Sequence, residues 1–392
     1  MSSIELFAGG GGLAMGMARA GFQHSAIIEW DDDACQTIRE NRSHYDSHGE
    51  DFVLFEGDAR KFDYSSYAGR VEVVSGGPPC QPFSLGGKHQ GNLDERDMFP
   101  TAVSVVHQTM PRAFIFENVK GLLRQSFANY FEYTYLQLSY PEITKRDGES
   151  WEAHLARLEG IHSSGKRPPT YNVLFRLLNA ADYGVPQKRE RVFLVGFRAD
   201  LGVEWSFPEP THSEDSLLYS KWVSGEYWDR HCIAKKDRPE SPERIAKRIS
   251  RLATPDMHSG QLRPWVTVRD AISDLPNPEK ASRIKIPNHN FTPGARVYKG
   301  HTGSPYDEPS KTLKAGAHGV PGGENMLVKD DGSVRYFTVR EAARLQTFPD
   351  NYIFHGAWGE TMRQLGNAVP VQLAETVASS VSTALRNQVG AP

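Results

Sequence analysis

Short, mainly apolar runs alternate with glycine-rich or helical segments through the first half of the chain. The runs at 4–7, 25–29, 52–55, 71–75 and 113–119 are rich in β-branched and aromatic residues, which is typical of strands buried on both faces. Helical or turn segments separate them, so the repeat predicts βα units and an open parallel sheet. We therefore expect an α/β fold whose ligands bind at the carboxyl ends of the strands.

A glycine-rich turn follows the first predicted strand. Gly9, Gly11 and Ala14 have the G-x-G-x-x-A spacing of a turn that lets the backbone approach a nucleotide cofactor and lets the next helix pack closely. We expect that helix to end before Gly21. Glycine turns between a strand and a helix also occur as plain structure, so this motif alone leaves both interpretations open.

Acidic and aromatic residues stand at the ends of the next two strands. Glu29 lies 18 positions beyond Gly11, a spacing suited to accepting hydrogen bonds from a ribose diol. Trp30 offers an aromatic face to a base or a sulfonium group. Asp58 can accept a hydrogen bond from an adenine amino group, or it can cap a turn or a helix. Together they favour an adenosine-type cofactor.

The fourth predicted strand, 71–75, leads into a rigid loop with a thiol at its tip. Two glycines and two prolines at 76–79 precede Cys80. A lone cysteine is most often an inert core residue, but this position at the carboxyl end of a strand favours a reactive thiol. Glu117 stands at the end of the fifth strand, so we expect Cys80, Glu117 and Glu29 at the same edge of the sheet.

Two arginines precede or begin a later strand. The strand pattern resumes at 171–176 and 192–197, beyond an insertion at 124–169 to which we assign no function. Arg189 and Arg191 occupy alternate positions of an extended segment, so their side chains point the same way and can jointly face an anion. The alternative is an edge strand with solvated charges.

Charge and composition change the picture in the second half. The net charge is −3, but residues 230–314 hold 17 Lys and Arg against 9 Asp and Glu, or +8, which leaves −11 for the remainder. A basic segment in an acidic body indicates that one part handles a polyanion. Proline and loop signals replace the βα pattern there. We expect a first domain at 1–200, a second, smaller domain at 201–335, and a return to the first at 336–392.

Several classes of protein are disfavoured by composition. The three cysteines, Cys35, Cys80 and Cys232, are far apart and form no C-x-x-C pair, which argues against a disulfide scaffold or a zinc site. The fourteen histidines are scattered, so we expect no metal. No run approaches the ~20 apolar residues of a membrane span, and the start lacks a signal-peptide core. We expect a cytoplasmic protein without a membrane partner.

The candidate residues together supply a specific chemistry. Carbon 5 of cytosine becomes nucleophilic only after a thiolate adds at carbon 6, and an acid at ring nitrogen 3 absorbs the developing charge. A thiol, a nearby carboxylic acid, an arginine pair and an adenosine-type cofactor site are the parts that this alkylation needs.

The sequence resembles the DNA (cytosine-5) methyltransferases of bacterial restriction-modification systems. The Pro-Cys-Gln and Glu-Asn-Val blocks are highly specific for that family, whereas the glycine turn alone is not. The match covers most of the chain outside the insertion and the basic segment. Its blocks, in order, are Phe7–Gly12, Glu29-Trp30, Gly57-Asp58, Gly77–Ser84, Glu117–Val119, Gln187–Arg191, Arg340–Pro349 and Gly366–Val369.

The resemblance implies a Rossmann-like S-adenosylmethionine-dependent methyltransferase fold with a target-recognition domain over the basic segment. It implies Cys80 as nucleophile and Glu117 as acid. Arg191 would hold the oxygen of a flipped cytosine, and Arg189 would contact a phosphate or be structural. The implied cofactor is S-adenosylmethionine, surrounded by Phe7, Ala8, Gly9, Gly11, Gly12, Glu29, Trp30, Asp58, Pro78, Asn367 and Val369. The implied DNA contacts are Gln81, Ser84, Thr312 and Leu313.

The implied function is sequence-specific methylation of carbon 5 of cytosine in double-stranded DNA, with a cognate restriction endonuclease as functional partner and a monomeric enzyme. A duplex hides carbon 5, so the base must be flipped out. A transfer RNA methyltransferase of the same family and a catalytically silent nucleic-acid-binding protein are the alternatives. The basic segment favours DNA, and the presence of Cys80 and Glu117 favours an enzyme. A nicotinamide-dependent dehydrogenase would leave both residues without a role.

Overall fold

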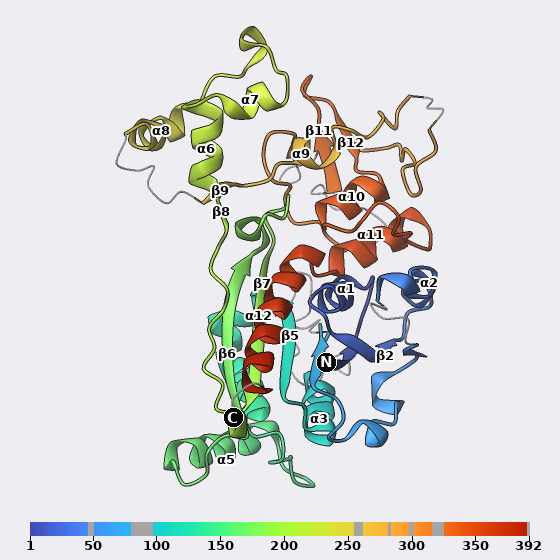
Figure 1. Cartoon of the computed structure of the whole chain (residues 1–392), viewed down its shortest axis with the longest axis vertical. Coiled ribbons are helices and arrows are strands. Elements are labelled where there is room, and N and C mark those ends of the chain that lie inside the picture. The colour runs from blue at the N-terminus through green and yellow to red at the C-terminus, as the bar shows by residue number, and fades with distance from the viewer. Residues whose placement is uncertain are drawn as a thin grey trace.

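A seven-stranded sheet forms the centre of the molecule (Figure 1). The computed structural model describes residues 1–45, 51–79, 97–254, 262–280, 284–297, 302–315 and 325–389. The strand order is β3-β2-β1-β4-β5-β7-β6. The first five strands of this order are parallel, and β7 runs antiparallel between β5 and β6. The strands are β1 Ser2–Leu6, β2 Gln23–Glu29, β3 Val53–Glu56, β4 Val73–Gly76, β5 Ala113–Val119, β6 Tyr171–Asn179 and β7 Glu190–Arg198.

The sheet confirms the predicted α/β class, with each expected strand present to within a few residues. It also corrects one interpretation of the arginine segment, because β7 pairs on both sides and is no edge strand. The connection from β6 to β7 contains only the short 3-10 helix Ala180–Tyr183 and a few further residues. Such a connection is too short for a parallel crossover, so the two strands are antiparallel neighbours.

Two cores cover the two faces of the sheet. In β5 the side chains alternate, so that Phe114 and Phe116 join one core while Ala113 and Ile115 join the other. The first core lies against α3, and the second lies against α1 and α12. A Cβ at Gly16 of α1 would lie 2.4 Å from Cβ of Ala374 in α12, so glycine permits this close helix contact. The helices are α1 Gly12–Arg19, α2 Asp32–Glu40, α3 Phe99–Thr109 and α12 Val371–Val389.

The predicted insertion forms a helical unit beside the sheet. It contains α4 Ala128–Ser139 and α5 Trp151–Ser164. The two helices share a small apolar core that includes Leu136 and Leu158. His154 is buried between them, with its ring nitrogens at hydrogen-bond distance from the Tyr133 hydroxyl and the Ile143 carbonyl. The unit is thus held by its own contacts.

The predicted second domain is divided between two cores. Leu217, Trp228 and Trp265 form a separate cluster around α6 and α7, whereas Leu313 and Leu327 join a core built with α10 and α11. The predicted division into domains at 200 and 335 therefore stays a prediction. Strand β12 crosses the expected boundary at 335. Its elements and the two helices after it are β8 His212–Ser213, α6 Glu214–Trp222, α7 Glu226–Arg230, α8 Ala246–Leu252, β9 Arg263–Pro264, α9 Val268–Ile272, β10 Ser304–Pro305, β11 Met326–Val328, β12 Val334–Tyr336, α10 Val339–Leu345 and α11 Trp358–Asn367.

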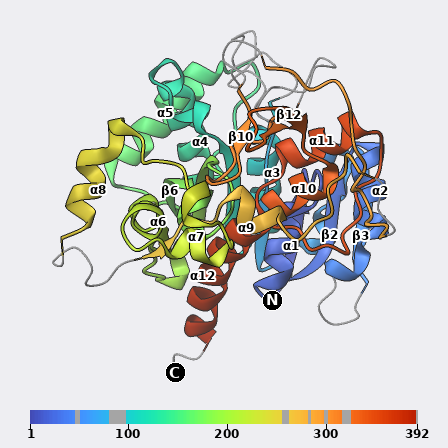
Figure 2. The same cartoon turned by 90° about the horizontal axis from the view of Figure 1, so that it is seen from above.

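Seen from above, α6, α7 and α8 lie on one side and β10, β12, α10 and α11 on the other (Figure 2). In Figure 1 both groups stand beyond the same end of the sheet. Among the described residues, no helix is long and apolar enough to cross a bilayer.

Candidate active site

The glycine turn after β1 has an uncommon backbone. Phe7, Gly9 and Gly11 have φ values of 56°, 53° and 79°, and a left-handed phenylalanine is energetically costly outside special sites. The Gly9 amide donates to the Glu29 carboxylate at 2.6 Å, and Gly11 caps the start of α1. The turn therefore brings bare backbone to the carboxyl edge of the sheet, as the sequence predicted.

Glu29 and Trp30 lie beside this turn. The Glu29 carboxylate is nearly buried and accepts from the amides of Gly9, Trp30 and Asp31. Burial raises the pKa of Glu29, and these amide bonds act against the rise. The Trp30 side chain is 76% exposed, an unusual position for so large an apolar ring. The pair fits the predicted contacts with a ribose and an aromatic or sulfonium group.

Asp58 caps a helix, which is the alternative to an adenine contact that its sequence position left open. It is the N-cap of the 3-10 helix Ala59–Lys61, and it accepts from the Arg60 amide at 2.9 Å. The Arg60 guanidinium also binds it, with Nη2 at 2.6 Å from Oδ2, and this contact lowers the pKa of Asp58. The predicted adenine contact stays a prediction, and an adenine would compete with Arg60 for this carboxylate.

The C-terminal block reaches the same turn from far along the chain. A Cβ at Gly12 would lie 2.1 Å from the Val369 carbonyl oxygen, so the two backbones are in close contact. Val369 is buried and Asn367 is exposed at the end of α11. The structure thus places Val369 at the glycine turn, and Asn367 lies two residues before it in the chain.

A buried acid and a buried arginine face each other at the ends of β5 and β7. In the antiparallel ladder Arg191 pairs with Val119 and Phe193 pairs with Glu117, so Arg191 is two residues along β7 from the partner of Glu117. Its Nε is 2.7 Å from Oε1 of Glu117, and the two residues are only 9% and 6% exposed. Burial raises the pKa of Glu117, although Arg191 and Arg189 act in the opposite direction. A carboxyl group in this setting is suited to proton donation.

The loop after β4 is anchored beside Glu117. The Asn118 side-chain amide donates to the Pro78 carbonyl at 2.9 Å, and the Met98 amide donates to the Pro79 carbonyl at 3.2 Å. A Cβ at Gly77 would lie 3.3 Å from Oε2 of Glu117. The predicted nucleophile Cys80 and the predicted DNA contacts Gln81 and Ser84 follow this anchor and lie outside the described residues.

Arg189 has a different environment from Arg191. It is fully buried, and two of its guanidinium nitrogens donate to the carbonyls of Leu313 and Gly366 at 3.1 and 2.7 Å. Both arginines lower the pKa of Glu117, so both guanidinium groups lie within electrostatic range of that carboxyl group. Of the two roles left open, phosphate contact and structural support, the structure favours structural support.

The Thr312-Leu313 dipeptide is bound to the same segment. The Thr312 hydroxyl donates to the Lys188 carbonyl at 2.7 Å, and the Leu313 amide donates to Oε1 of Gln187 at 3.0 Å. The Leu313 side chain is fully buried. The expectation that this side chain contacts DNA is therefore wrong for the structure described, because its apolar surface belongs to the core that packs against α10. Thr312 is only partly buried and stays a candidate contact.

Sequence reasoning missed two hydrogen-bonding residues of the site. Asn118 was only part of a matched block, yet it holds the loop that leads to Cys80. Gln187 is fully buried, and its side chain joins Leu313 to the Leu345 carbonyl of α10. Both residues belong to matched blocks of the sequence, but a block does not reveal the hydrogen-bond partner of a residue.

The basic segment is partly neutralised by acids of its own region. Arg248 pairs with Glu214 and Asp215, and Arg269 pairs with Asp307. On and beside α8, Arg244, Lys247 and Arg251 are exposed and pair with no acid among the described residues. These cations are the better candidates for phosphate contacts.

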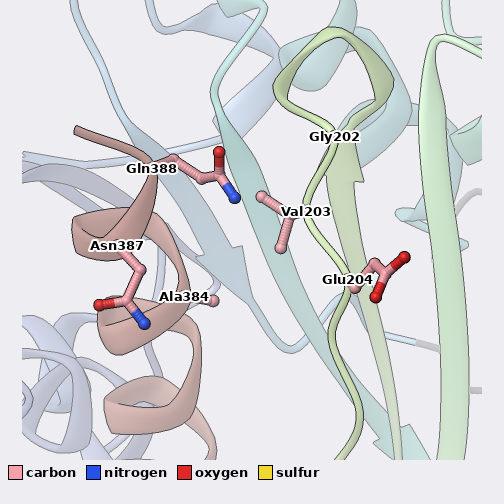
Figure 3. A pocket seen from close by; sticks show the side chains of 6 residues that line it. All are labelled: Gly202, Val203, Glu204, Ala384, Asn387 and Gln388. Atoms are coloured by element: carbon pink, nitrogen blue, oxygen red, sulfur yellow. The ribbon is translucent and has the colours of Figure 1, made fainter. Parts of the chain in front are cut away.

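One cavity lies away from this edge. It has a volume of about 300 Å³ and is bordered by Gly202–Glu204 and by the end of α12 (Figure 3). The chain enters this region from the end of β7, which pairs with the beginning of β5. Glu117 stands near the other end of β5, so the cavity and Glu117 are at different ends of the sheet. None of the predicted site residues borders the cavity.

Arg189→Met should destabilise the fold. Two buried carbonyls would lose their donor at a cost of about 2–4 kcal/mol in the free energy of unfolding, which urea unfolding measures. Arg176→Met, at a half-exposed ion pair with Glu209, should change it by less than about 0.5 kcal/mol.

The salt dependence of DNA binding separates the two roles of Arg189. A structural residue leaves the slope of log K against log salt unchanged in the folded variant. A stable Arg189→Met protein with a slope reduced by about 0.9 would instead show a phosphate contact.

The fold and this edge define a class of protein. A doubly wound sheet presents a glycine turn, an acidic residue and an exposed tryptophan at one edge, beside a buried acid and arginine. This is a Rossmann-like α/β protein, the class in which ligands bind at the carboxyl edge of the strands.

Comparisons with known proteins specify the family. The model for C-5 cytosine-specific DNA methylase matches residues 1–140 and 158–383. Type II methyltransferase M.NgoMIV of Neisseria gonorrhoeae is 30% identical over 394 residues, with 99% of each chain covered. M.Eco47II of Escherichia coli is 32% identical over 385 residues, covering 96% of this chain and 78% of that protein. The crystal structure of S. pombe Dnmt2 methyltransferase shares the fold, with a TM-score of 0.54, 16% identity and 99% of each chain covered.

The chain therefore belongs to the C-5 cytosine-specific DNA methylase family. It is an S-adenosylmethionine-dependent enzyme that methylates carbon 5 of cytosine in DNA, as the resemblance implied. The family model omits only 141–157 within the predicted insertion of 124–169. Helix α4 thus belongs to the family pattern, and the added segment is shorter than the sequence suggested.

Proposed function

We propose that Cys80, Glu117 and Arg191 perform the chemistry on a cytosine that is flipped out of double-stranded DNA. The Cys80 thiolate forms a bond to carbon 6, and the electron pair of the carbon 5–carbon 6 double bond moves into the ring. The Glu117 carboxyl group gives its proton to nitrogen 3, and Arg191 donates to the cytosine oxygen. Carbon 5 would then take the methyl group from S-adenosylmethionine, and the electron pair of the broken carbon–sulfur bond would stay on the sulfur. Loss of the carbon 5 proton to a base, departure of the thiolate and return of the nitrogen 3 proton to Glu117 restore the double bond and the neutral ring.

The buried Glu117–Arg191 pair carries this proposal. Proton donation to nitrogen 3 requires a carboxyl group that is still protonated near neutral pH, and burial raises the pKa of Glu117 in that direction. The anchors on Pro78 and Pro79 begin the Cys80 loop next to the same carboxyl group. Arg191 is close enough to orient the acid and has a planar donor array for a carbonyl oxygen.

The cofactor residues proposed here are those that the sequence indicated. S-adenosylmethionine supplies the electrophilic methyl group when it is bound. The left-handed backbone at Phe7, Gly9 and Gly11 shapes a turn that a cofactor can approach closely, and Trp30 offers an exposed ring. Glu29 is close enough to the turn to accept from a ribose as well. Ala8, Gly12, Asp58, Pro78, Asn367 and Val369 complete the proposed set.

The DNA partner and the cellular role extend the proposal. We infer a sequence-specific, monomeric enzyme of a restriction-modification system, with a cognate endonuclease and a site of action in the bacterial cytoplasm. The Type II names of the relatives support this role. The exposed cations near α8 support a target-recognition function for the 201–335 region.

Bisulfite sequencing tests the proposed function. DNA from cells that express the protein should contain 5-methylcytosine at one short recurrent sequence, and DNA from cells with the empty vector should not. An unmethylated genome, together with methyl transfer to transfer RNA by the purified protein, would instead support an RNA substrate. A protein that binds DNA but transfers no methyl group would be a silent binder.

A further inference from the structure

The glycine turn is fixed by a contact that comes from the far end of the chain. The Tyr352 hydroxyl donates to the Gly10 carbonyl at 2.9 Å. The Gly11 amide donates to the Ala8 carbonyl at 2.9 Å. Since the Gly10 carbonyl and the Gly11 amide belong to one planar peptide group, both polar ends of that peptide are held.

A second tyrosine completes this contact. The hydroxyls of Tyr45 and Tyr352 touch, and both side chains are fully buried. Because Tyr352 gives its proton to Gly10, Tyr45 is the donor to Tyr352. Burial raises the pKa of both phenols, so they stay protonated as this chain of donors requires. A Cβ at Gly11 would lie 1.8 Å from the Tyr45 oxygen, so the tyrosine pair fits only a glycine there.

The segment that carries Tyr352 is itself tightly held. The Asn41 side chain binds both the amide and the carbonyl of Ile353, at 2.8 and 2.6 Å. The Asn288 side chain binds the amide and the carbonyl of Phe354, at 2.8 and 3.1 Å. Side chains that replace a backbone partner in this way leave the segment little freedom, so the Tyr352 hydroxyl has a fixed direction.

We propose that Tyr352 is a positioning residue for S-adenosylmethionine. Its hydroxyl holds the Gly10–Gly11 peptide, and the Glu29 carboxylate holds the neighbouring Gly9 amide. The turn is thereby shaped before the cofactor arrives, which lowers the entropic cost of binding. This inference rests on the proposed cofactor site.

Tyr352→Phe removes one oxygen and tests the inference. The buried Gly10 carbonyl loses its donor and the turn gains freedom, so the Kd for S-adenosylmethionine should rise about tenfold. Isothermal titration measures this Kd. The KM for the cofactor should rise by a similar factor, whereas kcat at saturating cofactor and the KM for DNA should stay within about twofold.

Tyr171→Phe is the matched control. Tyr171 is also fully buried, and its hydroxyl donates to the Pro111 carbonyl at 2.7 Å in another part of the core. Both variants should lower the unfolding temperature, but only Tyr352→Phe should weaken cofactor binding. Equal cofactor affinity of the two variants, or a fall in kcat without a change in Kd, would overturn the inference.

Tyr45→Phe keeps the inference testable if Tyr352→Phe does not fold. The Tyr352 bond to Gly10 would remain but would lose its supporting donor, so the Kd should rise by about two- to threefold. An unchanged Kd would count against the tyrosine pair. A wild-type protein that binds no S-adenosylmethionine would instead overturn the proposed cofactor site, and this inference with it.

Discussion

Cys80→Ser is expected to reduce methyl transfer by a factor on the order of 10³ or more. A serine hydroxyl is far less acidic than a thiol, so almost no anion is available to add at carbon 6. Cys80 is not among the proposed cofactor residues, so binding of S-adenosylmethionine should be retained. Transfer of a labelled methyl group to DNA measures the loss, and titration with the cofactor confirms an intact fold.

A trapping experiment makes the same prediction specific to the thiol. In DNA with 5-fluorocytosine, the fluorine at carbon 5 cannot leave as the proton does, so the wild-type enzyme should stay covalently attached. Cys80→Ser should form no such adduct. Cys232→Ser is the control, because Cys232 is exposed in the basic region and should retain both activity and trapping. Near-wild-type methylation by Cys80→Ser would exclude the proposed mechanism.

Glu117→Gln should lower kcat by about 10²- to 10⁴-fold, the usual contribution of general acid catalysis. The amide cannot give a proton to nitrogen 3, and Arg191 loses one of the two carboxyl oxygens, the one 2.7 Å from its Nε. Glu209→Gln, at an exposed acid that pairs with Arg176, is the matched control and should keep full activity. Single-turnover methylation measures the chemical step directly.

The pH dependence distinguishes an acid from a residue that only positions Arg191. Burial raises the pKa of Glu117, so the protonated, active form is present below that pKa and is lost as the pH rises through it. The rate of the wild-type enzyme should therefore fall on the alkaline side. The Gln variant should lack that fall, and the ratio of the two rates should shrink with rising pH. A constant ratio would argue against proton donation.

The strand runs and the specific blocks could be predicted because they are local. Apolar runs of four to seven residues located the five parallel strands, and their order along the chain placed Glu29 and Glu117 at one edge. The Cys80 block could be recognised from its own residues, although its geometry lies outside the described ranges.

Other features depend on segments that meet only in the folded chain. Alternation indicated that Arg189 and Arg191 share a side, but it could not show that the carbonyls of Leu313 and Gly366 enclose Arg189. In the same way, β7 was expected as a strand, yet its position between β5 and β6 follows from pairing with both.

The sequence by itself determined the class of fold, the family and the chemical groups available to the reaction, since each depends on residues that are close together in the chain. Only the tertiary structure decided which of those groups are buried, which are paired and which are held by hydrogen bonds from distant segments. The separation of Arg191 from Arg189, the burial of Leu313 and the contact of Tyr352 with Gly10 all depend on long-range packing. A one-dimensional pattern specifies which face a side chain occupies, but the partner on that face is set by the path of the whole chain.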